Sequence, residues 1–371
     1  MNDFYNLTPS TPWLPPLILS TVVAIVLVKL TTLFLLPSPV QRINFFPDTN
    51  KSQLRTHHVV ITGGSSGIGY SLALQLSKSP IVKTITLIAR NEEKLRKAKI
   101  GILKELVPLV KPDTKEVGLQ QIEVNTCSID LSCTNSTSFN SASVTSNKII
   151  AGFGPPTILL NCAGTSSAAP INDTPFEVYS NLMSANYLSC VTTIKLFLPS
   201  MVKNKNGRIL ITSSGAGQVG LFGYTAYSGS KFALRGLAES LHFELPPNDI
   251  FLTMAYPPNT DTPGFEAENV DKPEETRRCE EEGGLYKPEE IARGIISGIE
   301  RGRVSCYWGI EGWMLSTLTC GMGPVDNVLD FLAQVFLTGL LRFISLFYLR
   351  DFRNVVSDVK RKREESLLKR D

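Results

Sequence analysis

A short apolar run that ends in a cluster of glycines restricts the fold of this 371-residue chain more than any other feature. Residues 59–62 indicate a buried strand, and residues 67–78 after the glycines have helical periodicity. A strand, a glycine turn and a helix in this order are typical of the first unit of a dinucleotide-binding α/β fold, where the helix N-terminus faces a pyrophosphate. The candidate cofactor-binding residues of the turn are Gly63, Ser65, Ser66, Gly67, Ile68 and Gly69.

Apolar runs and helical patterns alternate through the rest of this region. Strands are predicted at 59–62, 84–89, 122–129, 158–161, 208–212 and 250–255, and helices at 67–78, 92–106, 176–201, 226–243 and 288–301. This alternation predicts an α/β fold with a Rossmann-type doubly wound parallel sheet and helices on both faces, so that ligands bind at the carboxyl ends of the strands. Residues 262–286, rich in Glu and Gly, are predicted to form a mobile loop.

Composition excludes several classes of function. The net charge is +3, and no basic block lies near interleaved aromatic residues, which argues against nucleic-acid binding. Seven cysteines without CxxC spacing argue against a disulfide framework and a structural zinc site. With only three histidines, a metal centre or a histidine-based triad is not expected either.

The first of two membrane-facing stretches covers residues 17–36, which are almost entirely apolar and long enough to cross a bilayer. Lys29 interrupts this stretch, which keeps a shallow or re-entrant placement open. Basic residues occur just after the stretch, at Arg42, Lys51 and Arg55, and none precedes it. By the positive-inside rule, the main domain is therefore predicted to face the cytosol.

The second stretch, residues 328–349, is apolar but carries Asp330, Gln334, Thr338 and Arg342 at four-residue steps. This spacing predicts an amphipathic helix that lies in a membrane interface, the alternative being that its apolar face packs on the domain or on a second subunit. The predicted organisation is a membrane anchor and linker at 1–56, a catalytic domain at 57–310 and a C-terminal membrane-associated helix with a basic tail at 311–371.

Among ten tyrosines, only Tyr227 has a lysine four residues later, at Lys231, on the same helical face. A nearby ammonium and a cationic nicotinamide lower the pKa of a phenol, so Tyr227 is predicted to act as general acid towards a carbonyl. Ser214, at the end of the preceding strand, is predicted to donate a hydrogen bond to the carbonyl oxygen, with Ser213 as its competitor.

The identity of the cofactor is predicted from the residues that follow the second strand. A carboxylate there would bind the ribose diol of NADH, but the sequence has Arg90, with Lys94 four residues later. Two cations favour the 2′-phosphate of NADPH. Further candidate cofactor-binding residues follow the third and fourth strands: Asp130, Leu131, Asn161, Ala163 and Gly164.

Together these motifs make the chain resemble the short-chain dehydrogenase/reductases over roughly residues 57 to 265. The resemblance rests on the glycine turn, Asn161-x-Ala163-Gly164, Ser214 and Tyr227-x-x-x-Lys231. It implies that Asn186 is a fourth catalytic residue and that Thr262 binds cofactor. Where the family has Pro-Gly after the sixth strand, this chain has Pro257-Pro258.

Within that family, the segment around Tyr227, the loop that contains Thr262 and the membrane stretches at both ends are similar to reductases of long-chain keto-sphingoid bases. This similarity implies NADPH, a lipid substrate, and residence in the endoplasmic reticulum membrane with the catalytic domain facing the cytosol. Leu221, Phe222 and the loop beyond Phe265 are candidates for an apolar entrance, or for core packing or a dimer contact. A homodimer or homotetramer follows by analogy. The alternatives are a membrane-anchored steroid or retinoid reductase and a membrane protein that binds NADPH without turnover.

Overall fold

The structure is a computed structural model that describes residues 56–106, 122–133, 135–205 and 207–368, together with Thr21, Ile43 and Phe45. The chain divides into two compact units, Met1–Gln41 and Arg42–Asp371, and all of the described residues except Thr21 belong to the second. Apart from Thr21, the helix predicted at 17–36 lies outside the described residues.

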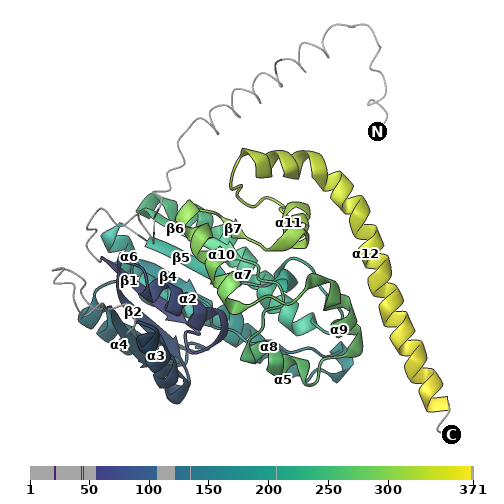
Figure 1. The fold of residues 1–371 in the computed structure, drawn as a ribbon, viewed down its shortest axis with the longest axis horizontal. Helices are drawn as coiled ribbons and strands as arrows, with labels where there is room; N and C mark the ends of the chain where they lie inside the picture. Colours follow the sequence, from purple (N-terminus) through teal and green to yellow (C-terminus); the bar gives the residue numbers. More distant parts are fainter. Residues whose placement is uncertain are drawn as a thin grey trace, which may run out of the picture. The chain divides into compact units, whose positions relative to one another are not determined.

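Parallel strands form one sheet in the order β3-β2-β1-β4-β5-β6-β7 (Figure 1). The strands are β1 (His57–Thr62), β2 (Val82–Ala89), β3 (Glu123–Ser128), β4 (Ile158–Asn161), β5 (Gly207–Thr212), β6 (Ile250–Ala255) and β7 (Ser305–Cys306). The predicted strands are confirmed close to their expected bounds. β7 was not predicted, because two residues are too few to show alternation. The strand order reverses between β1 and β4, and in such sheets the ligand crevice lies at this reversal.

Alternating side chains of the buried strands pack on opposite faces of the sheet, as the pleat requires. In β1, Val59 and Ile61 belong to one apolar core and Val60 to the other. The helices that cover the first face are α2 (Gly67–Ser77), α3 (Glu92–Leu106) and α10 (Pro288–Arg301). Those that cover the second are α4 (Ser136–Phe153), α6 (Ser189–Asn204) and α7 (Thr225–Glu244). The prediction of helices on both faces is confirmed.

The helix predicted at 176–201 contains a wider turn. It is formed by α5 (Phe176–Leu182), a π-helical segment η3 (Met183–Leu188) and α6 in direct succession. Short 3-10 turns lie at Ile171–Asp173, Gly215–Gly217, Pro246–Asn248 and Glu281–Gly283. Local π-helical turns occur often at functional sites.

The predicted loop at 262–286 is wrong, because the segment contains α8 (Pro263–Asn269) and α9 (Glu274–Glu280). Thr262 begins α8 as its N-cap, and its Oγ1 accepts a hydrogen bond from the backbone of Phe265 at 3.2 Å. Each helix has seven residues, too short for a periodic apolar pattern to appear against the charged composition.

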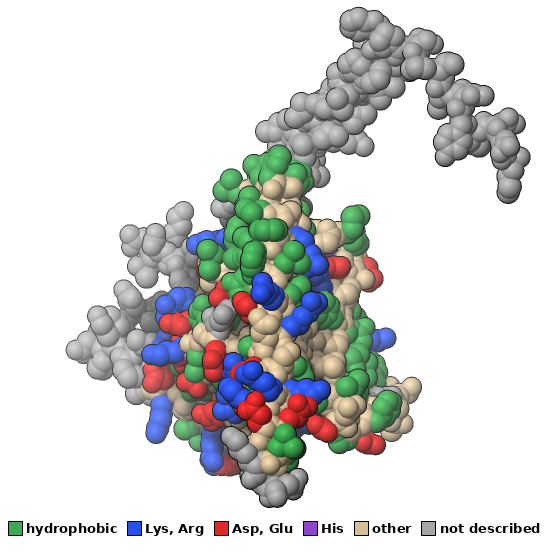
Figure 2. All heavy atoms as spheres, turned by 90° about the vertical axis from the view of Figure 1, so that its right-hand side faces the viewer, with side chains coloured by type: hydrophobic (Ala, Val, Ile, Leu, Met, Phe, Trp, Pro, Cys, Tyr) green, Lys and Arg blue, Asp and Glu red, His purple; other side chains and the backbone are tan. Residues whose placement is uncertain are grey.

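The C-terminal region consists of α11 (Gly309–Leu318) and the long α12 (Val328–Leu368), which extends well beyond the predicted residue 349. In the described part of the chain, α12 is the one helix long and apolar enough to cross a membrane by length and composition. Figure 2 shows hydrophobic side chains on the upper part of α12 and charged side chains on its lower part.

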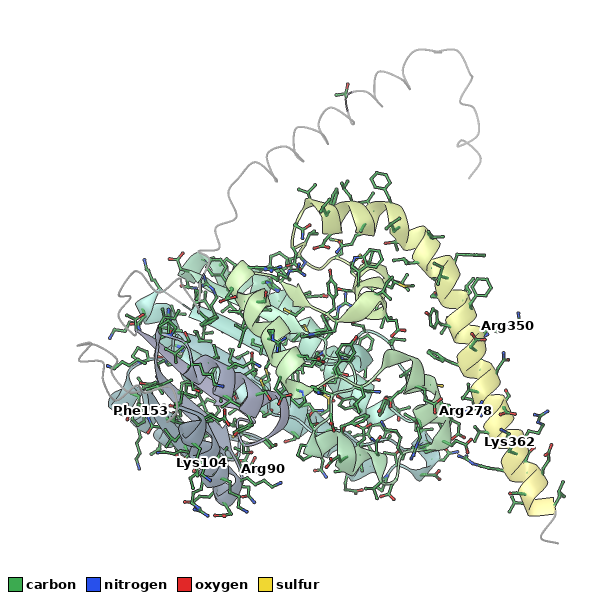
Figure 3. All side chains as sticks on the ribbon, in the orientation of Figure 1. Arg90, Lys104, Phe153, Arg278, Arg350 and Lys362 are labelled. Atoms are coloured by element: carbon green, nitrogen blue, oxygen red, sulfur yellow. The ribbon has the colours of Figure 1, made fainter. Side chains whose placement is uncertain are left out.

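The two halves of α12 make different contacts with the domain. In the first half Leu329 and Phe336 are 77% and 73% exposed, so the apolar face that carries them does not pack on the domain, whereas Leu341 on the opposite face is buried. In the second half Asp358 pairs with Arg278 of α9 at 2.9 Å, on the side where Figure 3 labels Arg278 and Lys362. Arg363 pairs in the same way with the buried Glu275 at 2.7 Å.

Candidate active site

The turn between β1 and α2 leaves room for a ligand to approach its backbone. Gly63 has a φ of +66°, and a Cβ on it would lie 2.8 Å from the carbonyl oxygen of Cys162. Gly67 has a φ of +55°, and its Cβ would lie 3.0 Å from Cγ2 of Thr262. Ser66 begins α2 without a side-chain hydrogen bond to the helix, so the first amides remain available to a ligand. Such a turn and helix N-terminus fit a dinucleotide pyrophosphate.

The loop after β4 is hydrogen-bonded to the end of β1. Oγ1 of Thr62 accepts hydrogen bonds from the backbone amides of Cys162 and Ala163, each at 3.2 Å. Asn161 donates from its side chain to a carbonyl of β5 at 3.0 Å, and so also joins β4 to the next strand. The structure thus brings Asn161, Ala163 and Gly164 to the crevice beside the glycine turn, as expected from the sheet order.

The candidate cofactor residues after β2 and β3 lie farther along the same edge. Arg90 and Lys94 are exposed, and within the described residues neither forms an ion pair; Figure 3 shows Arg90 near the α3 end of the domain. Asp130 is exposed and accepts a hydrogen bond from the backbone of Ser132 at 3.0 Å. Leu131 is buried in the core, so its backbone alone is available to a ligand. Two free cations fit a phosphate better than a ribose diol.

The predicted reactive residues converge where β5 ends and α7 begins. Nζ of Lys231 lies 5.7 Å from the ring centroid of Tyr227 and donates to the carbonyl of Thr212 at 3.2 Å. Ser214 lies close enough to Tyr227 for hydrogen bonding to lower the pKa of the phenol. Ser213 instead donates to the backbone carbonyl of Lys231 at 3.1 Å. Of the two serines, the geometry therefore favours Ser214 as the hydroxyl beside the phenol.

Asn186 lies in η3 and is only 1% exposed. Its Oδ1 accepts from the backbone of Thr165 at 2.8 Å, and its Nδ2 donates to Oγ of Ser230 at 2.8 Å. A Cβ on Gly164 would lie 2.9 Å from Oδ1 of Asn186 and 3.5 Å from Nζ of Lys231. Asn186 therefore belongs to the same constellation as Lys231, where the resemblance implied a fourth residue.

Burial dominates the electrostatics of this constellation. Burial lowers the pKa of Lys231 to about 8. Burial also raises the pKa of Tyr227 above its ordinary value, while the hydrogen bond with Ser214 opposes that rise and the charges of Glu268 and Glu280 add to it. For the protein alone the pKa of the phenol is raised, because loss of solvation outweighs the hydrogen bonding of Ser214. A phenol that keeps its proton at neutral pH is suited to donate it.

A cavity of about 790 Å³ contains the reactive groups. Of the predicted site residues, it is lined by Ile68, Gly164, Ser214, Tyr227, Lys231 and Thr262. Its apolar walls come from α11 and α12 and include Met314, Leu315, Leu318, Leu341, Tyr348 and Phe352. Leu221 and Phe265 line it as predicted for an entrance, whereas Phe222 is not among the lining residues.

Sequence reasoning missed a charged group in the cavity wall. Nζ of Lys272 lies 2.7 Å from Oε1 of Glu268 and 2.6 Å from Oε2 of Glu280, and the Tyr224 hydroxyl donates to Glu268. We call these four residues the charged cluster. The one sequence signal was the four-residue spacing of Glu268 and Lys272, which is common on solvated helices and gives no hint of burial.

A family model described as short chain dehydrogenase matches residues 57–273. The chain belongs to this family. Bos taurus 3-ketodihydrosphingosine reductase is 44% identical over 299 residues, covering 81% of this chain and 85% of the relative. Danio rerio 3-dehydrosphinganine reductase is 40% identical over 314 residues, covering 84% and 89%. The protein of that first name from Dictyostelium discoideum is 34% identical over 274 residues, covering 73% and 80%.

Solved structures agree on the fold. A short-chain dehydrogenase from Sphingobium yanoikuyae in complex with NADPH superposes with a TM-score of 0.55 at 20% identity, covering 68% of this chain and 87% of that one. Actinorhodin polyketide ketoreductase with NADPH gives a TM-score of 0.57 at 19% identity, covering 69% and 96%. The Rossmann-type architecture predicted from the strand alternation is confirmed.

Proposed function

We propose that this chain catalyses the NADPH-dependent reduction of 3-ketodihydrosphingosine to dihydrosphingosine, a step of sphingolipid synthesis. The observation that carries the proposal is a single cavity in which Ser214, Tyr227 and Lys231 face apolar walls from α11 and α12. Reactive polar groups in a mainly apolar cavity suit a polar keto head group on an alkyl chain. The names of the relatives supply the particular substrate.

The residues present fit NADPH, which supplies a hydride to the keto carbon when bound. The glycine turn and the start of α2 would hold its pyrophosphate, and Arg90 and Lys94 its 2′-phosphate. Asp130, Asn161, Ala163, Gly164 and Thr262 would complete the binding surface.

Each reactive side chain has a distinct role in this proposal. Tyr227 gives its proton to the keto oxygen as negative charge develops there, and Ser214 donates a hydrogen bond to the same oxygen. Lys231 positions the phenol from the next turn of α7. Asn186 fixes the loop after β4 next to Lys231 through its bonds to Thr165.

We place the enzyme on the membrane of the endoplasmic reticulum, with its catalytic domain in the cytosol. The support for a membrane is that α12 turns its apolar face outward, with Leu329, Val335, Phe336, Leu340 and Phe343 all exposed, while its opposite face lines the cavity through Leu341 and Ser345. The organelle and the cytosolic side rest on the family resemblance and on the basic residues after the first membrane-facing stretch. An apolar face of this extent suits contact with lipid. A substrate tail could then pass from the bilayer along α12 to the reactive groups.

The test is a parallel assay on the purified, detergent-solubilised full chain. We expect NADPH to be consumed with 3-ketosphinganine and not with a steroid ketone or retinal. Tyr227→Phe should slow the reaction by roughly 10²- to 10⁴-fold, the usual contribution of a general acid. As a matched control, Tyr179→Phe removes a phenol hydroxyl bonded to Thr225 outside the cavity and should leave the rate unchanged. Consumption of the steroid or retinal alone would refute the proposed substrate.

A further inference from the structure

The charged cluster places two carboxylates in the wall of the cavity, beside one buried ammonium. The side chains of Lys272, Glu268 and Glu280 are 1%, 6% and 10% exposed. Glu268, Glu280 and Tyr224 line the cavity, whereas Lys272 lies behind them and is not among the lining residues. The carboxylates are thus presented to a ligand and the ammonium is not.

Formal charges within the cluster do not balance. Two carboxylates face one ammonium, which leaves one negative charge, and buried charge is costly unless it is paired. Oε1 of Glu268 accepts from both Tyr224 and Lys272, while no described residue donates a hydrogen bond to its Oε2. A carboxylate has room for several donors, so Glu268 retains a free acceptor in a side chain that is almost entirely buried.

This unbalanced charge lies close to the reactive phenol. The rings of Tyr224 and Tyr227 are 5.2 Å apart between centroids, and the Tyr224 hydroxyl is bonded to Glu268. Burial raises the pKa of Tyr227 most, and the negative charges of Glu268 and Glu280 add to that rise. A ketone bound at Tyr227 therefore shares one cavity with the two carboxylates.

We propose that Glu268 and Glu280 are specificity-determining residues that bind a primary ammonium on the carbon next to the ketone. This inference rests on the proposed function, because 3-ketodihydrosphingosine carries an amine at that position. The ammonium supplies the missing positive charge and donates to the free oxygen of Glu268. Amino ketones are thereby selected over ketones without a cation, which include steroids and retinoids.

The first test compares two substrates on the wild-type full chain with NADPH. One is 3-ketosphinganine and the other is its analogue with the same chain and hydroxyl but no amine. We expect kcat/KM to be roughly 10- to 100-fold higher for the amine, the range of a hydrogen bond to a charged group. Equal values for the two ketones would overturn the inference and leave the proposed function standing. Reduction of neither ketone would overturn the proposed function itself.

The second test uses variants. Glu268→Gln should abolish most of the preference by lowering kcat/KM for the amine alone, with NADPH affinity unchanged. Glu266→Gln, on the exposed side of the same helix, is the matched control and should keep the preference. If Glu268→Gln lowered kcat/KM equally for the two substrates, the charged cluster would have only a structural role and the inference would fail. If that variant does not fold, Glu280→Gln and the wild-type substrate comparison decide the matter in the same way.

Discussion

The burial of Lys231 in the candidate active site should lower the free energy of unfolding by an amount that can be measured. The residue is 6% exposed, and burial lowers its pKa from 10.5 to about 8. One pKa unit corresponds to about 1.4 kcal/mol. The charged form of Lys231 therefore destabilises the folded state by roughly 3 kcal/mol. Lys231→Met removes that charge with a side chain of similar length. It also removes the hydrogen bond to Thr212, which costs about 1 kcal/mol.

We therefore expect Lys231→Met to be more stable than the wild type by about 2 kcal/mol at neutral pH while losing most of its activity. The stability difference between Lys231→Met and the wild type should also depend on pH. Because the folded-state pKa lies below the unfolded value, the wild type gains stability from this group as pH rises from about 8 to 10.5, and the variant does not. The advantage of the variant should shrink over that range.

The assay is denaturant unfolding of the purified full chain, followed by tryptophan fluorescence at neutral pH and at about pH 10. Lys203→Met, an exposed lysine of α6, is the control and should leave the pH dependence as in the wild type. A stability difference between Lys231→Met and wild type that is the same at both pH values would refute the reasoning. So would a variant that is less stable than the wild type at neutral pH.

Three further outcomes are expected. Arg90→Asp should weaken NADPH binding by roughly 10- to 100-fold and NADH binding much less, measured by cofactor fluorescence; equal losses would mean that Arg90 is only a surface charge. Ser214→Ala should lower kcat by about 10²- to 10³-fold, whereas Ser213→Ala should mainly lower the free energy of unfolding by about 1 kcal/mol, and the reverse result would exchange their roles. Gly63→Ala should destabilise the fold by about 1–3 kcal/mol and weaken NADPH binding, because the φ of +66° at Gly63 and the nearby Cys162 carbonyl leave no space for a Cβ. An unchanged melting temperature would contradict this prediction.

Features with a local sequence signal were predictable. The apolar runs that became β1 to β6 are bounded by turns and helices, and their order alone placed Gly63, Asn161, Ser214 and Tyr227 at one edge of the sheet. The resemblance to a known family added Asn186, whose bonds to Thr165 and Ser230 depend on chain folding and leave no mark on neighbouring residues.

Features that depend on burial were not predictable. Glu268, Lys272 and Glu280 occur in a charged stretch that indicates solvent, yet Glu268 of α8 and Glu280 of α9 line the cavity, and Lys272 between the two helices is buried beside them. The pKa of Tyr227 was predicted to fall because the argument from sequence counted a neighbouring charge and had no measure of desolvation. In both cases the deciding quantity is access to water, which neither composition nor spacing reveals.

The π-helical segment η3 has a consequence for how this scaffold tolerates deletions. A π turn holds one residue more than an α turn, so removing a single residue from η3 can restore ordinary α-helical bonding without breaking the rod formed by α5 and α6. Because the wide turn absorbs the extra residue locally, α5 and α6 would keep their facing, while the residues of the turn itself would repack and the Asn186 amide would move away from the lysine. A shortened descendant could thus keep its architecture while losing turnover.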